Sequence, residues 1–160
     1  RQETTQPQAI DLQQWLTDFK EEFCQSHQLD TGQLLTEFET DHLTILFNPS
    51  HLHQVIDNLC SNAIRHHDKT HADIIIQIRT GYDSSLDQPY LDIIDNGPGI
   101  SQEQATQIFD PFYTTSAKGT GLGLFISKEI IESNRAKIRY LEQPVGSCFR
   151  IHFLSAVTDD

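Results

Sequence analysis

The sequence predicts an α+β domain in which a mixed, mostly antiparallel sheet is covered on one face by three helices. Three observations point to this two-layer sandwich. Three segments carry helical apolar stripes, and the strand-like segments come in pairs that are typical of hairpins. The length of 160 residues, with 37% hydrophobic content, suits one hydrophobic core.

The first predicted elements are a helix and a hairpin. Residues 1–10 are polar and unpatterned, and Asp11 can cap the helix that follows. The apolar residues of this helix share one face: Leu12, Trp15, Leu16, Phe19 and Phe23. Extended runs at residues 33–38 and 43–47 then predict a hairpin with its turn at residues 39–42.

The middle of the chain predicts a second helix and two further strands. Residues 52–64 follow Pro49 and place one apolar stripe on a helix: Leu52, Val55, Ile56, Leu59 and Ala63. Strand-like runs at residues 74–79 and 90–95 flank a polar loop of Gly, Asp, Ser and Pro. We expect both strands in the main sheet.

The last third predicts two helices and a closing hairpin. Ser101 and Gln104 have capping-box spacing, which opens a short helix that ends near Asp110 and Pro111. A glycine-rich segment leads into the third long helix at residues 122–132. Strands at residues 137–142 and 147–153 follow, the second with alternating apolar side chains, and they predict another hairpin.

Composition excludes several classes of protein. The net charge of −12 has the wrong sign for binding a nucleic-acid backbone. The sequence contains no run of 18 apolar residues and no secretory leader. Its three cysteines lack metal-ligand spacing, which fits a reducing cytoplasm. It begins at Arg1 and has no Met, so we expect a fragment of a longer protein.

A polar stripe on the second helix carries the first candidate site residues. Asn58, Asn62 and Arg65 are four and three residues apart, so they face one place. An Asn carbonyl oxygen can bind Mg²⁺, which usually brings phosphates with it, and Arg65 could neutralise those phosphates. Taken alone, the stripe is more typical of a solvated helix face.

Asp95 is the second candidate. Strand alternation places it on the same side as Leu91 and Ile93, toward the core. A carboxylate there needs a donor, either a neighbouring group or a ligand such as the exocyclic amine of adenine. Gly97 and Gly99 would let the backbone approach a flat ligand, although Asp-Asn-Gly is also a common hairpin turn.

The glycine-rich segment before the third helix is a candidate anion site. Free amides at a helix N-terminus suit phosphates, and Lys118 adds a positive charge. Leu124 occupies a position where the dinucleotide fingerprint requires Gly, and the chain has no P-loop pattern. The clustered histidines, including His66, His67 and His71, lack the partners that a zinc site requires.

Four segments in a fixed order together resemble the N, G1, F and G2 boxes of sensor histidine kinases, members of the GHKL superfamily. They run from Asn58 to Ala63, from Asp95 to Ile100, from Ile108 to Phe112 and from Gly119 to Leu124. The resemblance covers about residues 11–154, and residues 134–151 are similar to the pilus-regulating subgroup. It implies the Bergerat ATP-binding fold, shared with gyrase-type and Hsp90-type ATPases.

By this resemblance, the ligands are ATP and Mg²⁺. Asn62 would coordinate Mg²⁺, while Asn58 and Arg65 would contact the phosphates. Asp95 would bind the adenine amine, and His66 would lie against the adenine ring. Residues 112–118 would form a short ATP lid. The other nucleotide contacts would come from the glycine-rich segments: Gly97, Gly99, Ile100, Lys118, Gly119, Thr120, Gly121, Leu122 and Gly123.

The resemblance also implies a reaction. Hydrolytic relatives carry a water-activating Glu four residues before the Mg²⁺ ligand, where this chain has Asn58, and an amide cannot serve as a general base. We therefore expect Asn58 and Asn62 to support transfer of the γ-phosphoryl group to a histidine. No acceptor histidine motif occurs in the chain, so we expect it not to phosphorylate itself.

The implied parent protein is a membrane-attached homodimer of the inner membrane, with this domain in the cytoplasm. Its own dimerisation and phosphoacceptor domain and a response regulator would be the partners. Residues 1–10 would be a remnant of an upstream linker or dimerisation helix, residues 11–155 the catalytic domain and residues 156–160 a polar tail. The alternatives are a water-activating ATPase, a degenerate nucleotide-binding module and a serine-directed anti-sigma kinase.

Overall fold

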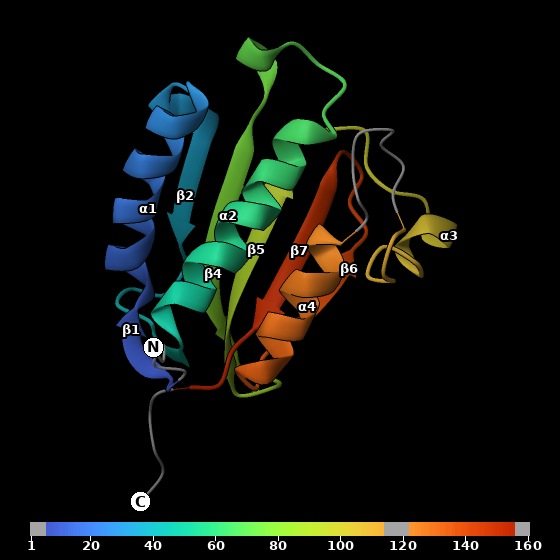
Figure 1. Ribbon diagram of the computed structural model, residues 1–160. Coiled ribbons are helices and arrows are strands. Elements are labelled where there is room, and N and C mark those ends of the chain that lie inside the picture. Colours follow the sequence, from blue (N-terminus) through green and yellow to red (C-terminus); the bar gives the residue numbers. More distant parts are fainter. Residues whose placement is uncertain (1–5, 114–121, 156–160) are drawn as a thin grey trace, which may run out of the picture.

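The computed structural model describes residues 6–113 and 122–155, which form a layer of helices against a layer of strands (Figure 1). The helices are α1 (Leu12–His27), α2 (Pro49–Arg65), α3 (Gln102–Ala105) and α4 (Gly123–Ser133). The strands are β1 (Gln8–Asp11), β2 (Leu34–Phe38), β3 (Thr44–Phe47), β4 (Ile76–Asp83), β5 (Gln88–Asp95), β6 (Lys137–Leu141) and β7 (Ser147–His152). Two short 3₁₀ helices are Thr31–Gln33 and His71–Asp73.

The main sheet has five strands in the order β2-β4-β5-β7-β6. Only the β2–β4 pair is parallel, and the other three pairs are antiparallel. Helices α1, α2 and α4 lie side by side on one face of this sheet (Figure 1). The predicted mixed, mostly antiparallel sheet with three covering helices is therefore confirmed.

The two long N-terminal helices form where their stripes and caps predict. Asp11 Oδ1 accepts a hydrogen bond from the Gln14 backbone amide at 3.2 Å, which caps α1. Helix α2 begins at Pro49, earlier than its apolar stripe indicates. Asn48 Oδ1 accepts hydrogen bonds from the amides of Ser50 and His51, and proline suits the first helical position. The apolar stripes of both helices are buried against the sheet.

The predicted hairpin over residues 33–47 is wrong. Strand β2 pairs with β4 in the main sheet, whereas β3 pairs with β1 in a separate two-stranded sheet. The amide of Glu39 still bonds to the Thr80 carbonyl, so the chain follows β4 before it turns away. No pattern predicts β1, because only Ile10 of its four residues is buried, and the domain start expected at residue 11 falls inside it.

The β4–β5 and β6–β7 pairs are hairpins. In the first hairpin Ile76 of β4 lies opposite Asp95 of β5, and Asp83 lies opposite Gln88 next to the turn. Strand β6 pairs with β7 as predicted. Helix α3 has the predicted capping box of Ser101 and Gln104 but ends at Ala105, before the Asp110-Pro111 pair. The Thr106 hydroxyl bonds to the Glu103 carbonyl, a local hydrogen bond that competes with helix continuation.

Candidate functional site

Asp95 is fixed at the end of β5 by two hydrogen bonds. Its register partner on β7 is Ser147, whose hydroxyl donates to Asp95 Oδ2 at 2.5 Å. The Gly97 amide donates to Asp95 Oδ1 at 2.8 Å. The side chain lies on the helix-covered face with Leu91 and Ile93, as alternation predicts. Each carboxylate oxygen has a second lone-pair direction that can accept a further donor.

The predicted polar stripe of α2 lies near the start of α4. Asn58 Nδ2 donates to the Gly123 carbonyl at 2.9 Å and to Ser127 Oγ at 2.7 Å. Farther along α2, Arg65 Nη2 donates to Asn62 Oδ1 at 3.2 Å. The stripe is therefore not a simple solvated face, because Asn58 joins two helices.

His66 occupies the C-cap position of α2 and is half-buried. Burial is the main cause that lowers the pKa of His66, and the neighbouring Arg65 charge lowers it further. A neutral imidazole is therefore favoured at this position. Such a ring presents a flat face without a competing charge.

The glycine-rich segment lies only partly within the described residues. Lys118, Gly119, Thr120 and Gly121 fall outside them, so their predicted contacts stay predictions. Leu122 is the N-cap residue of α4, and Gly123 follows it. A Cβ atom at Gly123 would lie 3.1 Å from Asn58 Oδ1, so glycine allows α2 and α4 to approach each other here.

The loop after β5 packs tightly against the β6–β7 loop. A Cβ atom at Gly99, where φ is 81°, would lie 2.8 Å from the Gly146 carbonyl oxygen. The Ile100 amide donates to the Tyr140 hydroxyl at 3.3 Å. A cavity of about 420 Å³ is lined by residues 97–101 and 142–146 together with Tyr140. It includes Gly97, Gly99 and Ile100 but neither Asp95 nor Asn62.

Several residues of this region are not predicted from the sequence. Ser147 and Tyr140 come from the last hairpin, and His67 and Asn96 lie beside the predicted residues. Only the strand register pairs Ser147 with Asp95, and a sequence pattern cannot supply that register. The Asn96 side chain accepts a hydrogen bond from the Ile75 amide, a contact between segments 21 residues apart.

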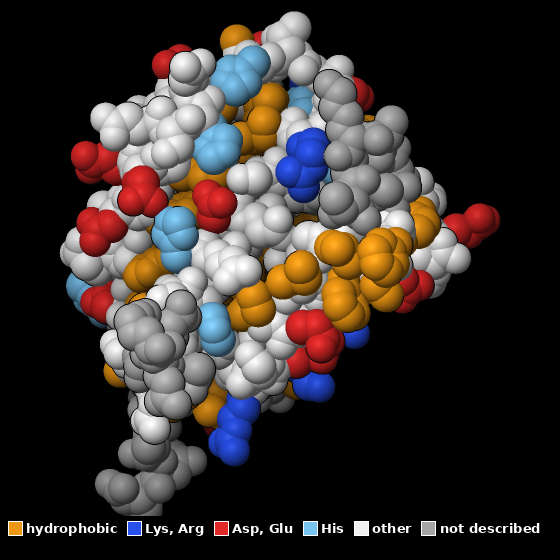
Figure 2. Space-filling view, in the orientation of Figure 1, with side chains coloured by type: hydrophobic (Ala, Val, Ile, Leu, Met, Phe, Trp, Pro, Cys, Tyr) orange, Lys and Arg blue, Asp and Glu red, His pale blue; other side chains and the backbone are white. Residues whose placement is uncertain are grey.

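The helix-covered side of the molecule carries histidines along α1 and α2, and hydrophobic side chains near α3 and the start of α4 (Figure 2). Within residues 6–113 and 122–155, no group of three or more His, Cys, Asp or Glu side chains could hold a metal ion. The cysteines, Cys24, Cys60 and Cys148, are buried free thiols.

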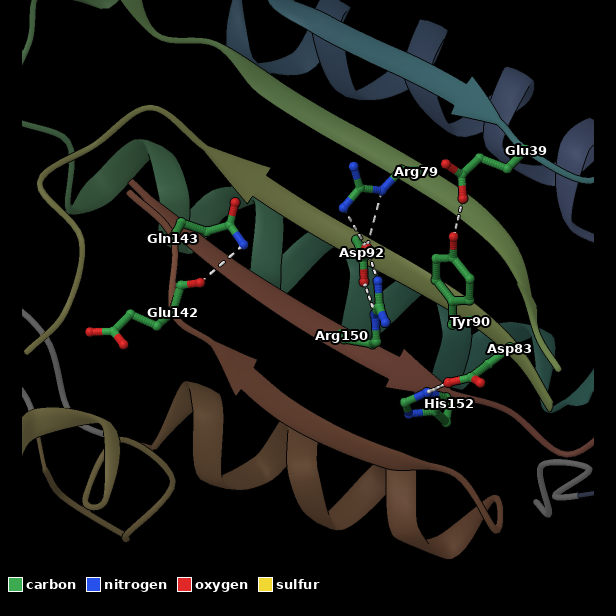
Figure 3. Close-up of polar contacts among 9 residues, drawn as sticks. All are labelled: Glu39, Arg79, Asp83, Tyr90, Asp92, Glu142, Gln143, Arg150 and His152. Carbon is green, nitrogen blue, oxygen red and sulfur yellow. Dashed lines mark hydrogen bonds and ion pairs between the residues drawn. The ribbon is translucent and has the colours of Figure 1, made fainter. Parts of the chain in front are cut away.

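The opposite face of the sheet carries a separate polar cluster (Figure 3). Asp92 is fully buried and accepts hydrogen bonds from Arg79 on β4 and from Arg150 on β7. The Arg150 guanidinium lies 4.2 Å from the centre of the Tyr90 ring, and the Tyr90 hydroxyl donates to Glu39. These side chains alternate with those that face the helices, so they lie away from Asp95.

Comparisons with known proteins agree with the fold and with the resemblance to histidine kinases. The family described as "Histidine kinase-, DNA gyrase B-, and HSP90-like ATPase" matches residues 47–157. The chain is 36% identical over 154 residues to sensor protein kinase PilS of Pseudomonas aeruginosa, and this alignment covers 96% of the chain and 29% of PilS. It is 27% identical over 129 residues to sensory histidine kinase/phosphatase NtrB of Escherichia coli O157:H7, and this alignment covers 77% of the chain and 37% of NtrB.

The solved catalytic domain of histidine kinase ThkA, in a nucleotide-free form, is similar with a TM-score of 0.74 and 26% identity. The match covers 93% of this chain and 95% of that domain. The chain thus corresponds to nearly all of one catalytic domain but to a minor part of the longer curated relatives. No helix in the described part of the chain is long and apolar enough to cross a bilayer.

Proposed function

Because the chain belongs to the histidine kinase-, DNA gyrase B- and HSP90-like ATPase family, as an ATP-binding catalytic domain of the histidine kinase type, we propose that it donates the γ-phosphoryl group of ATP to a histidine. The acceptor would lie on a dimerisation domain of the same protein, for relay to a response regulator. The observation that carries this proposal is the fixed Asp95 carboxylate, which is oriented by Gly97 and Ser147. It can accept a hydrogen bond from the adenine amine.

The donor chemistry of the site fits ATP and Mg²⁺. Asn62 offers a carbonyl oxygen, the ligand type that Mg²⁺ prefers, and the Arg65 guanidinium beside it can pair with a phosphate. The bound cation would neutralise charge on the phosphates. The N-terminus of α4, opened by Leu122 and Gly123, lies close enough to Asn58 for one anion to meet both helices. The contacts of residues 118–121 with the phosphates remain part of the proposal.

Asn58 favours phosphoryl transfer over hydrolysis of ATP. Its amide nitrogen donates to Gly123 and Ser127, and the amide has no proton-accepting capacity at neutral pH. A water-activating ATPase would need a carboxylate in its place. The described residues of α2 supply positioning and charge, which are the protein's main contributions to phosphoryl transfer.

An exposed apolar patch supports docking of a phosphoacceptor domain. Phe112 is 72% exposed and Ile126 is 41% exposed, and Figure 2 shows hydrophobic side chains gathered over α3 and the beginning of α4. A contiguous exposed apolar patch is typical of an interaction site, whereas single exposed apolar residues are not. The parent protein would be a membrane-attached homodimer with this domain in the cytoplasm, as PilS-like sensor kinases imply.

Calorimetric titration with a non-hydrolysable ATP analogue, with and without Mg²⁺, tests the site. We expect the wild-type chain to bind and Asp95→Asn to bind at least about tenfold more weakly, because a carboxylate acceptor is lost and an amide donor can face the adenine amine. Asp18→Asn, on the exposed side of α1, is the matched control. A folded wild-type chain that does not bind, or equal binding by Asp95→Asn, would overturn the proposed site.

A second assay separates the two reactions. The chain, mixed with ATP and a dimerisation-domain fragment of its own parent protein, should label that fragment with phosphate while releasing little free phosphate alone. Steady release of phosphate by the isolated chain would instead support the hydrolytic alternative.

A further inference from the structure

The side chain of Asn96, the residue that follows Asp95, connects its own loop to His67 and to residues 73–75. Its Oδ1 accepts a hydrogen bond from the Ile75 amide at 2.9 Å, and its Nδ2 donates to the Asp73 carbonyl at 3.0 Å. His67 Nε2 lies 2.6 Å from the same Oδ1. The orientation of the amide is fixed, because a flipped amide would place a donor against the Ile75 N–H and an acceptor against the Asp73 carbonyl.

This arrangement determines the tautomer of His67. The Lys69 backbone amide lies 3.0 Å from His67 Nδ1, and a backbone N–H can only donate. Nδ1 is therefore the acceptor, and the ring proton is on Nε2, from which it is donated to Asn96. A neutral ring with the proton on Nε2 satisfies both contacts at once.

The same ring lies against the backbone of the loop that orients Asp95. A Cβ atom at Gly97 would lie 3.6 Å from His67 Cδ2 and 3.0 Å from Asp95 Oδ1. Lys69 Nζ also donates to the Asn96 carbonyl at 2.9 Å. Residues 67 and 69, which follow α2, thus hold both the side chain and the backbone of Asn96, and the next amide along, that of Gly97, donates to Asp95.

We propose that His67 is a positioning residue for nucleotide binding: its neutral, Nε2-protonated ring fixes Asn96 and Gly97, and through them the Asp95 carboxylate. This inference rests on the proposed role of Asp95 in binding adenine. His67 does not touch the nucleotide in this scheme. It contributes by keeping the loop in the binding orientation before the ligand arrives.

Two substitutions separate the two hydrogen bonds of the His67 ring, the one to Asn96 and the one from Lys69. In His67→Gln the side-chain amide nitrogen takes the place of Nε2 and can still donate to Asn96. In His67→Asn the side-chain oxygen takes the place of Nδ1 and keeps only the contact with Lys69. We expect the dissociation constant for a non-hydrolysable ATP analogue to rise about tenfold in His67→Asn and to stay within about twofold of wild type in His67→Gln.

His53→Asn is the matched control, because His53 is an exposed histidine of α2 whose ring contacts the Glu22 carboxylate on α1. Thermal unfolding of each variant shows whether it folds. Equal affinity of His67→Asn and wild type, or equal weakening by His67→Gln and His67→Asn, would overturn the inference.

The tautomer can be tested without nucleotide. Imidazole ¹⁵N chemical shifts of the wild-type chain should show His67 neutral with the proton on Nε2, and the opposite tautomer would contradict the assignment. If the wild-type chain shows this tautomer but binds no ATP analogue, the proposed function fails and the role of His67 in nucleotide binding fails with it. If it binds and only His67→Asn is impaired, both stand.

Discussion

Gly146 determines how closely the last hairpin can approach the residue proposed to bind adenine. Its φ is 75°, which favours glycine, and a Cβ atom there would lie 1.8 Å from the Asp95 carbonyl oxygen. Because Ser147 follows directly, the glycine also sets the position of the hydroxyl that holds Asp95 Oδ2. The lack of a side chain at Gly146 therefore allows the hairpin position in which Ser147 holds the Asp95 carboxylate.

We expect Gly146→Ala to lower the free energy of unfolding by at least about 2 kcal/mol, because positive φ and a backbone clash act together. Urea denaturation measures this loss, and the ATP analogue should bind more weakly to whatever fraction remains folded. Gly32→Ala is the matched control, since a Cβ atom at Gly32 meets nothing within 4 Å. Equal losses in the two variants would contradict the argument.

The side chain of Asn58 joins helices α2 and α4, and it acts as the hydrogen-bond donor in both contacts with α4. Asn58 Nδ2 donates to the Gly123 carbonyl, which cannot reverse its role, and to Ser127 Oγ, which is almost fully buried. The first turn of α4 is thereby attached to the helix that carries Asn62 and Arg65. The relative placement of the two elements depends on the amide group of Asn58.

We expect Asn58→Asp to destabilise the chain by about 1–3 kcal/mol, because a carboxylate would face the Gly123 carbonyl with no proton to donate. Ser127→Ala, which leaves that contact intact, should cost less. Thermal or urea unfolding of both variants at neutral pH measures the difference. An Asn58→Asp chain as stable as the wild type would show that the two helices do not depend on this donor.

The elements show which parts of the fold are predictable from sequence. The stripes of α1 and α2 and the β6–β7 hairpin are local patterns, and they are confirmed. Strand β2 pairs with β4 and β3 pairs with β1, so neither pairs with the strand next to it in sequence, and the spacing that predicts a β2–β3 hairpin is misleading. Asp95 is placed correctly by alternation, whereas Ser147 becomes its partner only through the register of β5 with β7.

At the scale of the whole molecule, the sheet separates two polar regions with different surroundings. Asp95 faces the helices near the loops, while Asp92, three residues earlier, faces the other way and is neutralised by Arg79 and Arg150 (Figure 3). Two guanidiniums on neighbouring strands compensate the fully buried carboxylate. The same sheet therefore holds Asp92, whose charge is balanced by two ion pairs, and Asp95, which can accept a hydrogen bond from a ligand.

The response to acid should reveal a contact between the β4–β5 turn and β7. Asp83 Oδ1 accepts hydrogen bonds from Ser85, and Oδ2 lies 3.2 Å from His152 Nε2. The Ser85 hydroxyl is the main cause that lowers the pKa of Asp83 from 3.8 to about 2, and His152 lowers it further. A depressed folded-state pKa stabilises the fold above about pH 3.8, and this stabilisation is lost as the pH falls toward 2.

We therefore expect the wild-type chain to lose stability between about pH 4 and pH 2 more steeply than Asp83→Asn, whose amide does not titrate. Asp41→Asn, in an exposed turn, should keep the wild-type slope. Urea unfolding midpoints at a series of pH values measure the three slopes. The chain has 11 Lys and Arg and 8 His against 23 Asp and Glu, so its net charge becomes increasingly positive as the carboxylates are protonated below about pH 4. General repulsion therefore grows on acidification in every variant, and only a difference between slopes reports Asp83. Parallel slopes for wild type and Asp83→Asn would mean that the turn and β7 contribute no carboxylate-dependent stability.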